Sequence, residues 1–168
     1  MRKNIQIQPL TQESFSAFGD VIEKENHDFF AINQGLTQRY NALSVAQISG
    51  DNTVVGMSIF HNLCATEIPF KIDMLERHPH GSQSFIPLQQ QKFIIIVALP
   101  LDQTQPNEQK IYAFLSNGKQ GVTYHQRAWH HPLITLEAKS DFLVVDRIGG
   151  GQNCDVHPLA VLRWIVES

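Results

Sequence analysis

Short runs rich in Val, Ile, Phe, Tyr and Thr recur along the chain and alternate with turn residues. Such runs are typical of β-strands, because β-branched and aromatic side chains pack well on a pleated surface. The pattern predicts strands at 53–60, 70–77, 84–88, 92–99, 110–115, 132–137 and 141–147. The segments between them carry the Gly, Pro or Asn that tight reversals require, as at 80–82, 100–106, 116–118 and 149–151. Many short strands with this spacing predict a mainly β fold, either an antiparallel barrel or a double-sheet roll.

The two ends of the chain have helical spacing instead. Thr11 can cap a short N-terminal helix with Glu13 in its first turn, Phe15 and Phe18 on one face, and Gly19 at its end. A second helix is predicted near the C-terminus, over residues 158–167, from the apolar positions Leu159, Leu162, Ile165 and Val166. We expect this tail to close over one end of the barrel or to pack on a partner subunit.

Composition narrows the class of protein. A chain of 168 residues, 42% hydrophobic and 17% charged, is long enough for one good core, so we expect a single domain over 1–168. The net charge is −3, and no basic run is interleaved with aromatic residues, which argues against a nucleic-acid partner. No apolar run approaches the ~20 residues of a membrane span, and the N-terminus lacks the apolar core of a signal peptide. We therefore expect a soluble cytoplasmic protein. Cys64 and Cys154 are far apart, so neither a disulfide framework nor a thiolate zinc site is indicated.

Two short stretches, 76–83 and 124–131, hold five of the chain's eight histidines. Imidazole titrates and coordinates metals near neutral pH, so these stretches are the candidates for chemistry. Strand alternation would place Glu76, His78 and His80 on one face and Arg77 on the other. Pro79 indicates that the strand ends here or lies at an edge, which would open the side chains toward a pocket mouth. An exposed polar face is the plain alternative for any one of them.

The second stretch lies where a turn leads into a strand, a common position for functional residues. We favour a functional role for His125 and a core or rim position for Trp129, whose indole buries a large area. His130 and His131 are adjacent and would face opposite ways in an extended segment. At most one of them is expected to share a pocket with His125, and alternation does not decide which.

The arrangement His-x-His, then Gln83, then a third histidine after a Gly-rich turn is similar to a degenerate form of the two cupin motifs. Neutral imidazoles on one strand, an amide or carboxylate on the next and an imidazole across the barrel can converge on one divalent metal. The candidate ligands are His78, His80, Gln83 and His125.

The residues around these histidines resemble the signature of the ureidoglycolate lyase family, also called ureidoglycolate hydrolase. The matching segments are 76–79, 81–83, 85–87, 121–122, 124–125, 129–133, 141–143 and 146–147, with 15–22, 28–30, 32–33, 35 and 39–40 near the N-terminus. They span nearly all of the chain except the tail. The resemblance implies a cupin-like double-stranded antiparallel β-barrel, or jelly roll. It also implies a carbon–nitrogen lyase of allantoin and purine degradation that releases urea and glyoxylate from (S)-ureidoglycolate, usually as a homodimer.

His80 departs from the family pattern, in which this position is varied. The resemblance therefore gives less weight to His80 as a ligand, and Gln83 is a poorer ligand than a glutamate would be. A divalent metal, nickel or manganese, stays open as a cofactor, while no cofactor is strictly required.

Cleavage of ureidoglycolate requires a base and an acid, because this carbinolamide breaks down when its hydroxyl loses a proton and its urea nitrogen gains one. His125 or His78 could take the hydroxyl proton, and Glu76 or the other histidine could supply the leaving urea. No covalent nucleophile is needed.

The substrate carboxylate requires a cation or fixed donors, for which Arg39, Arg147 and Arg77 are candidates with a bidentate fork. Arg77 ranks lowest, since alternation turns it away from Glu76. The ureido group could be bound by Gln83 and Asn33. The candidate substrate-binding set is completed by Trp129, His130 and His131.

Two other classes of function stay open. One is a metal-dependent cupin isomerase or oxygenase that acts on another small carboxylic acid, which His80 favours. The other is a noncatalytic cupin that binds a small acid and regulates or stores it. That class would call for an appended DNA-binding helix pair, and the predicted strands leave no room for one.

Overall fold

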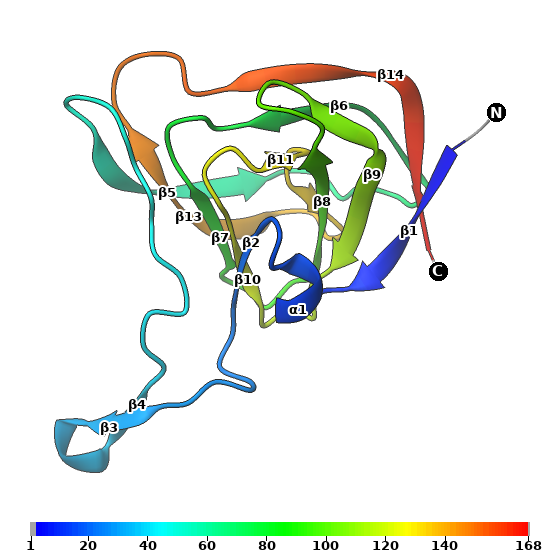
Figure 1. The fold of residues 1–168 in the computed structure, drawn as a ribbon. Coiled ribbons are helices and arrows are strands. Elements are labelled where there is room, and N and C mark those ends of the chain that lie inside the picture. The colour runs from blue at the N-terminus through cyan, green and yellow to red at the C-terminus, as the bar shows by residue number, and fades with distance from the viewer. Residues whose placement is uncertain (1–2, 168) are drawn as a thin grey trace.

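The computed structural model describes residues 3–167 and is built mainly of β-strands (Figure 1). The only α-helix of the described residues is the short α1 (Gln12–Phe15). The strands are β1 (Lys3–Pro9), β2 (Gly19–Ile22), β3 (Phe30–Ile32), β4 (Thr37–Arg39), β5 (Val54–Asn62), β6 (Phe70–Arg77), β7 (Gln83–Pro87), β8 (Phe93–Pro100), β9 (Pro106–Leu115), β10 (Gly121–Tyr124), β11 (Trp129–His130), β12 (Ile134–Thr135), β13 (Ser140–Ile148) and β14 (Asp155–Val166). Each of the seven predicted strands overlaps one of these.

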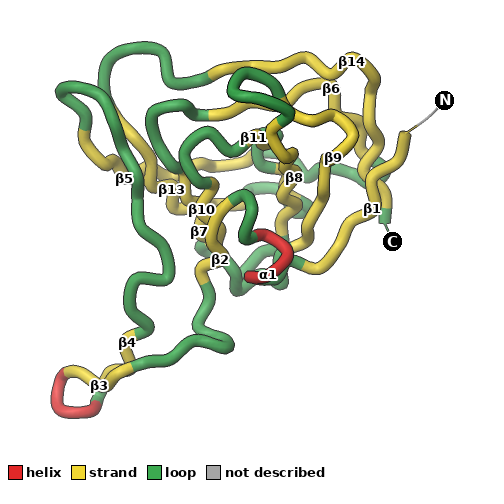
Figure 2. Tube along the Cα trace, in the orientation of Figure 1, coloured by secondary structure: helices red, strands yellow, loops and turns green. Residues whose placement is uncertain are grey.

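Two sheets make up the body of the molecule. The larger sheet has the order β11-β6-β14-β1-β9-β8-β12, and β11 also bonds to β8, so the sheet closes on itself. The second sheet has the order β2-β10-β7-β13-β5 and packs beside the first (Figure 2). The predicted cupin-like β-barrel is confirmed. One detail differs from an all-antiparallel barrel, because β1 runs parallel to both of its neighbours, β14 and β9.

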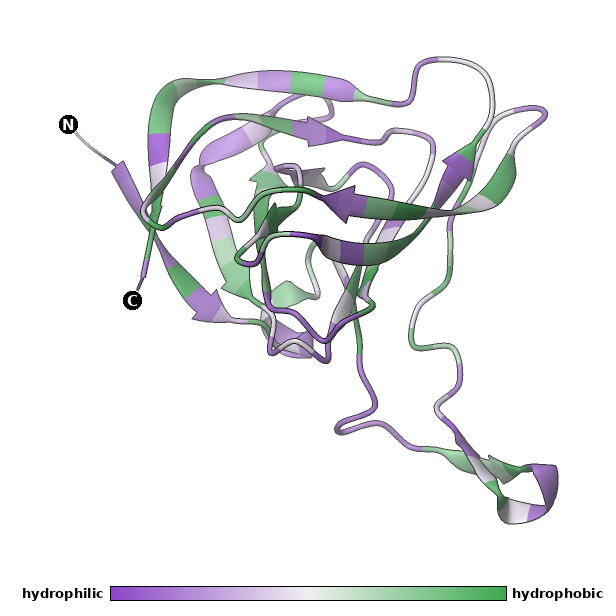
Figure 3. Cartoon of the chain, turned by 180° about the vertical axis from the view of Figure 1, so that it is seen from behind, coloured by the Kyte–Doolittle hydropathy of each residue, from purple (hydrophilic) through white to green (hydrophobic). Residues whose placement is uncertain are grey.

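Strand β8 separates two hydrophobic cores. Alternate residues of this strand face opposite ways, so Phe93, Ile95 and Val97 belong to the core between the two sheets. Ile94, Ile96 and Ala98 belong to the core inside the closed sheet. An uninterrupted apolar strand is expected where both faces are buried. Figure 3 shows the hydrophobic residues running along the strands of the barrel.

The N-terminal helix is confirmed but shorter than predicted. Thr11 accepts a hydrogen bond from the backbone N–H of Ser14, as a helix N-cap does. Phe15 and Phe18 are both buried, although only Phe15 lies in the helix. Gly19 is the first residue of β2. Its backbone passes so close to β10 that a Cβ at this position would lie 1.8 Å from the carbonyl oxygen of Thr123, which explains why the residue is glycine.

The predicted C-terminal helix is wrong, because residues 155–166 form the long strand β14. This strand pairs with β6 on one side and β1 on the other, and its register with β6 shifts between Pro158 and Arg163. The irregularity breaks the period-two pattern, and the apolar residues then mimic helical spacing. Hydrogen bonds to two neighbouring strands decide the outcome against that local spacing.

An arm projects from the body of the molecule between β2 and β5 (Figures 1 and 2). We use the word arm for residues 23–43, which include the hairpin of β3 and β4. Every residue of β4 is exposed, and β3 is nearly so.

None of the described helices has the length and apolar character needed to cross a lipid bilayer.

Candidate functional site

Glu76, His78 and His130 come together at the end of β6 and on β11. Each offers one ligand atom, and these atoms all lie within 4.8 Å of one another. Strand pairing explains the meeting, because His130 of β11 lies directly opposite Glu76 of β6. We call these three residues the triad. Two imidazoles and one carboxylate form a ligand set typical of divalent transition metals.

Backbone carbonyls orient both imidazoles of the triad. The Nδ1 of His78 lies 2.7 Å from the carbonyl oxygen of Asn153, and the Nδ1 of His130 lies 2.9 Å from that of Ala128. A carbonyl oxygen only accepts, so each Nδ1 carries the hydrogen. When the rings are neutral, each Nε2 therefore has a free lone pair, which is how second-shell partners prepare metal-binding histidines.

His130 is held neutral by its surroundings. Its side chain is 2% exposed and stacks on Tyr124 with ring centroids 4.2 Å apart. Burial, together with the smaller effect of the nearby His78, lowers the pKa of His130 to about 3. Its Nε2 has no hydrogen-bond partner and lies 3.7 Å from a carboxylate oxygen of Glu76. A buried polar atom without a partner is uncommon and indicates a site for water, a metal or a ligand.

A pocket of about 340 Å³ opens onto the triad. Its other lining residues come from three further segments, namely Phe60 and Asn62 of β5, Gln83 and Phe85 of β7, and Pro132 and Leu133 after β11. The Nδ2 of Asn62 is buried and unpartnered. The pocket thus offers an unpaired donor and an unpaired acceptor, and its volume is suited to a small molecule.

Asn62 was missed by sequence reasoning. It is the last residue of the largely apolar strand β5, and none of the candidate histidine stretches is near it in sequence. Its proximity to the triad arises from the packing of one sheet on the other, which a single sequence does not reveal.

The predicted metal ligands separate in the structure. His78 belongs to the triad, and Gln83 lines the pocket, where its amide donates to the Asp146 carboxylate at 3.1 Å. His80 is exposed, and its backbone N–H donates to Asn153. Neither His80 nor His125 is among the residues that line the pocket.

His125 lies beyond the end of β10, where its Nε2 is 3.1 Å from a carboxylate oxygen of Asp20. Its backbone N–H donates to Phe18, and its carbonyl accepts from Ala128, so it starts a turn rather than continuing the strand. Because of this turn, His125 is not part of the triad, and His130 is the histidine of this segment that belongs to it.

Alternation correctly separates Arg77 from Glu76 and His130 from His131, but it is wrong for His80, because β6 ends at Arg77. Trp129 belongs to the core inside the closed sheet, whereas its neighbour His130 faces the pocket. Arg77 lies over the Trp129 ring at 4.7 Å and forms an ion pair with Asp155 at 2.9 Å. His131 packs edge-on against Phe70, and it does not line the pocket. Arg77, Trp129 and His131 thus lie away from the triad.

The remaining predicted substrate-binding residues do not line the pocket of this chain. Asn33 and Arg39 lie in the exposed arm (Figure 1). Arg147 donates to the carbonyl oxygens of Ser49 and Gly150 and is not a lining residue.

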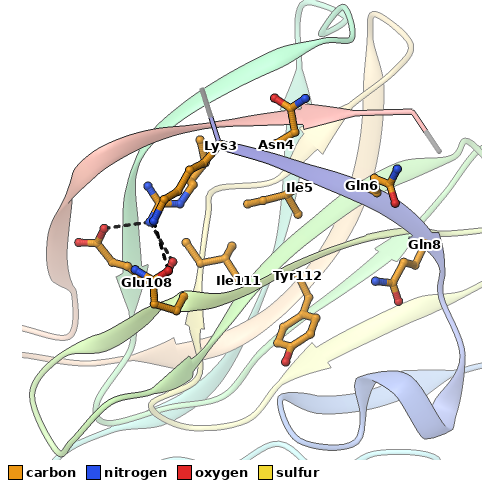
Figure 4. Close-up of a pocket in the computed structure, with 10 residues that line it drawn as sticks. Lys3, Asn4, Ile5, Gln6, Gln8, Glu108, Ile111 and Tyr112 are labelled. Atoms are coloured by element: carbon orange, nitrogen blue, oxygen red, sulfur yellow. Dashed lines mark hydrogen bonds and ion pairs between the residues drawn. The ribbon is translucent and has the colours of Figure 1, made fainter. Parts of the chain in front are cut away.

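A second, larger hollow of about 580 Å³ lies between β1 and β9 (Figure 4). Lys3, Ile5, Ile111 and Tyr112 line it, together with the pair of Arg163 and Glu108. Arg163 is 4% exposed and donates to the carboxylate and the carbonyl oxygen of Glu108. Its buried charge is already paired, and among the described residues this hollow has no buried side-chain N or O atom without a partner.

The fold and the triad define a small cupin-like protein with a histidine and carboxylate site. The family model described as ureidoglycolate lyase matches residues 2–167. The chain therefore belongs to the ureidoglycolate lyase family, and the resemblance noted in the sequence is confirmed.

Similar proteins agree with this assignment. A protein named ureidoglycolate lyase from Pseudomonas savastanoi pv. phaseolicola is 49% identical over 166 residues, which is 99% of this chain and 95% of the relative. The protein of the same name from Pseudomonas paraeruginosa is 48% identical over 157 residues, or 92% of this chain and 90% of the relative. The protein of the same name from Stutzerimonas stutzeri is 48% identical over 153 residues, which is 91% of this chain and 88% of the relative.

Proposed function

We propose that this protein is a cytoplasmic carbon–nitrogen lyase that cleaves (S)-ureidoglycolate to glyoxylate and urea in the degradation of allantoin and purines. The observation that carries the proposal is the triad beneath a small pocket, in a chain that belongs to this family. The proposal includes a homodimer as the working state.

The net reaction transfers one proton from the hydroxyl oxygen to the urea nitrogen and cleaves the C–N bond between them. The hydroxyl of the carbinolamide gives up its proton, a C=O bond forms at that carbon, and the C–N bond breaks with its electron pair leaving on the urea nitrogen. That nitrogen then gains a proton, so the overall proton count is unchanged. A base and an acid in the pocket are sufficient for both transfers.

The presence of Glu76 and His78 in the pocket lining supports a role for both in these transfers. In the proposal, the Glu76 carboxylate takes the hydroxyl proton, which then passes to the leaving nitrogen either directly or by way of the Nε2 of His78. The amides of Asn62 and Gln83 orient the ureido and carboxylate groups. Phe60, Phe85 and Leu133 exclude water, which strengthens these polar contacts.

The triad also fits a divalent metal such as nickel or manganese. Two imidazoles oriented by backbone carbonyls, one of which has an unpartnered buried Nε2, and one carboxylate are groups that suit such an ion. A bound ion would act as a Lewis acid toward the substrate oxygens.

A coupled assay for glyoxylate on (S)-ureidoglycolate tests the proposal. The purified protein should be active, and His78→Ala should reduce kcat/KM strongly. His125→Ala separates the two histidine assignments, because the sequence predicts a catalytic role for His125 and the triad supports His78. A His78→Ala/His125→Ala double variant with full activity would rule out both.

A second candidate is a metal-dependent cupin isomerase or oxygenase that acts on another small carboxylic acid. The specific observation in its favour is the pairing of two histidines with one carboxylate, a ligand set that iron(II) oxygenases use. This candidate predicts a stoichiometric metal, no activity on ureidoglycolate and oxygen uptake with another acid. Metal analysis together with the glyoxylate assay separates the two functions.

A further inference from the structure

The pocket has no lysine or arginine among its lining residues. The proposed substrate is a carboxylate, and Glu76 already places one negative charge in the pocket. Bringing a second carboxylate next to it is unfavourable unless a cation compensates. The Lys and Arg side chains of a single chain thus supply no positive charge to the pocket lining.

The arginines nearest in sequence to the triad residues do not supply this charge through their known contacts. Arg77 is paired with Asp155 and also donates to the carbonyl oxygen of Gln103. Arg147 is bonded to two backbone carbonyls. Arg127 is exposed on the turn after His125 and does not line the pocket.

Arg39 differs from these arginines. It lies at the end of β4 in the arm, is exposed, and has no acidic partner within the part of the chain that the structure describes. Its guanidinium stacks on the Phe30 ring at 5.8 Å, and Phe29 packs on Tyr40 with ring centroids 5.5 Å apart. The arm thus presents an ordered, unpaired arginine in an aromatic setting.

The arm also exposes more apolar surface than a free hairpin tolerates. Phe29 and Phe30 are each 50% exposed, and Leu36 at the tip is 87% exposed. Two strands of three residues each are marginally stable in water unless another surface covers them. The apolar tip therefore indicates a docking partner.

Strand β5 offers a matching surface on the same chain. It is the edge of its sheet, and Val55, Met57 and Ile59 form an exposed apolar stripe along one face. A long, exposed apolar edge strand is a site of association. Phe60 lies on the opposite face of the same edge strand, is 41% exposed and lines the pocket, so the pocket opens next to this edge.

We propose that the arm docks against β5 of a second copy of this chain and brings Arg39 to the mouth of that copy's pocket, where its guanidinium binds the substrate carboxylate. The partner is a second copy because one chain carries both surfaces. Each chain has an apolar arm that carries the unpaired cation Arg39. Each chain also has an apolar edge strand, β5, beside a pocket that contains the anion Glu76. In a two-fold dimer, the arm of each chain covers β5 of the other, and Arg39 of each chain reaches the pocket of the other. The role of Arg39 rests on the proposed function, whereas the docking of the arm does not.

Subunit complementation tests the transfer of Arg39 between copies. Arg39→Ala should raise KM about 10–100-fold, because a charge-assisted bidentate contact to the carboxylate is lost. His78→Ala should lack turnover because its own pocket is damaged. The two variants are dissociated, mixed in equal amounts and reassociated, then assayed below KM. About a quarter of the wild-type activity should return, since half of the randomly paired dimers hold one complete site.

The alternative of a site completed within one chain predicts no recovery on mixing, and that result would overturn the proposal. Arg127→Ala serves as the matched control, because Arg127 is the exposed arginine on the turn beside His78. A raised KM in Arg127→Ala with an unchanged KM in Arg39→Ala would also overturn it. Arg39→Lys should restore part of the affinity.

Sedimentation of the purified protein tests the docking without reference to activity. The wild type should be a dimer at micromolar concentration, and Leu36→Asp or Met57→Asp should shift it to a monomer. Leu101→Asp is the control, since Leu101 is 61% exposed on a loop outside both surfaces. A monomeric wild type, or a dimer unchanged in both variants, would contradict the docking. An inactive wild type that is dimeric and dissociated by Leu36→Asp would instead contradict only the proposed function.

Discussion

The pocket above the triad is smaller than the hollow between β1 and β9, yet it is the pocket that has unpartnered buried polar atoms. The hollow has the larger volume, about 580 Å³ against about 340 Å³. Its buried Arg163 is fully engaged by Glu108 and by backbone carbonyls. The smaller pocket contains two of the four unpartnered buried side-chain atoms of the described residues, Asn62 Nδ2 and His130 Nε2, whereas the hollow contains none.

Unsatisfied polar groups therefore identify the site better than volume does. Leaving a buried donor or acceptor unpaired lowers the free energy of unfolding by about 1–3 kcal/mol. A protein keeps such a group where a bound ligand forms the missing hydrogen bond. The charges of the hollow are satisfied within the fold and contribute to stability. Four variants test this contrast, two in each region.

The largest effect is expected from Glu76→Gln in the pocket. The amide keeps the shape of the side chain but cannot act as a base, so kcat/KM should fall by about 10²–10⁴-fold. The free energy of unfolding should change little, because Glu76 has only a long contact to the Cys154 thiol and a 3.7 Å approach to His130. Glyoxylate release and urea denaturation measure the two quantities. An active Glu76→Gln enzyme would contradict the assignment of the pocket as the site.

The reverse pattern is expected from Glu108→Ala in the hollow. The substitution leaves the buried Arg163 without its carboxylate, and breaking such a pair costs about 3–5 kcal/mol of unfolding free energy. Glu108 also accepts from His157 and from the backbone of Ala160, which adds to the loss. The kcat/KM of the folded fraction should match the wild type. A loss of kcat/KM at full stability would make the hollow part of the site.

An intermediate effect is expected on acid stability from His130→Gln. The pKa of His130 is lowered to about 3 by burial, whereas the same group in the unfolded chain has its ordinary value of 6.5. Between these values the unfolded chain binds a proton that the folded protein does not. The stability is thus complete above pH 6.5 and decreases as the pH falls toward 3, by up to about 1.4 kcal/mol per pH unit.

The His130→Gln variant should lack this dependence of the unfolding free energy on pH, whatever its unfolding free energy at neutral pH. Urea denaturation at several pH values, with a chelator present so that no metal contributes, measures the slope of each protein. Equal slopes for wild type and His130→Gln would show that His130 does not titrate as a buried neutral group.

The smallest effect is expected from Lys3→Ala at the rim of the hollow (Figure 4). Lys3 is exposed and bonds only to the side chain of Gln109 among the described residues. The unfolding free energy should change by less than about 0.5 kcal/mol, and KM should be unchanged. A raised KM would indicate that the hollow binds an anionic ligand.

Much of the barrel could be predicted from the sequence because its strands carry continuous or alternating apolar residues. Strand β6 was predicted with its observed ends, and β8 within one residue at each end. Alternation within a strand also placed Arg77 away from Glu76 and separated His130 from His131. These arguments need only the local geometry of an extended chain.

The rest depends on contacts that have no local signal. The short strands β2, β10 and β11 are defined by their partners, and β14 follows two neighbours across an irregular register. His125 begins a turn, where alternation no longer applies, and Asn62 reaches the pocket from the other sheet. Asn33 and Arg39 lie in an arm whose direction no pattern of hydrophobic residues predicts.

The position of β1 has a consequence for how the chain folds. This strand lies between β9 and β14, with Lys3 opposite Arg163 and Pro9 opposite Leu115. On a ribosome, β1 emerges before β9 and long before β14, its two partners. The closed sheet cannot form until β14 has been made, so nascent chains that lack β14 should be sensitive to proteases. Contacts between such distant segments also favour slow folding.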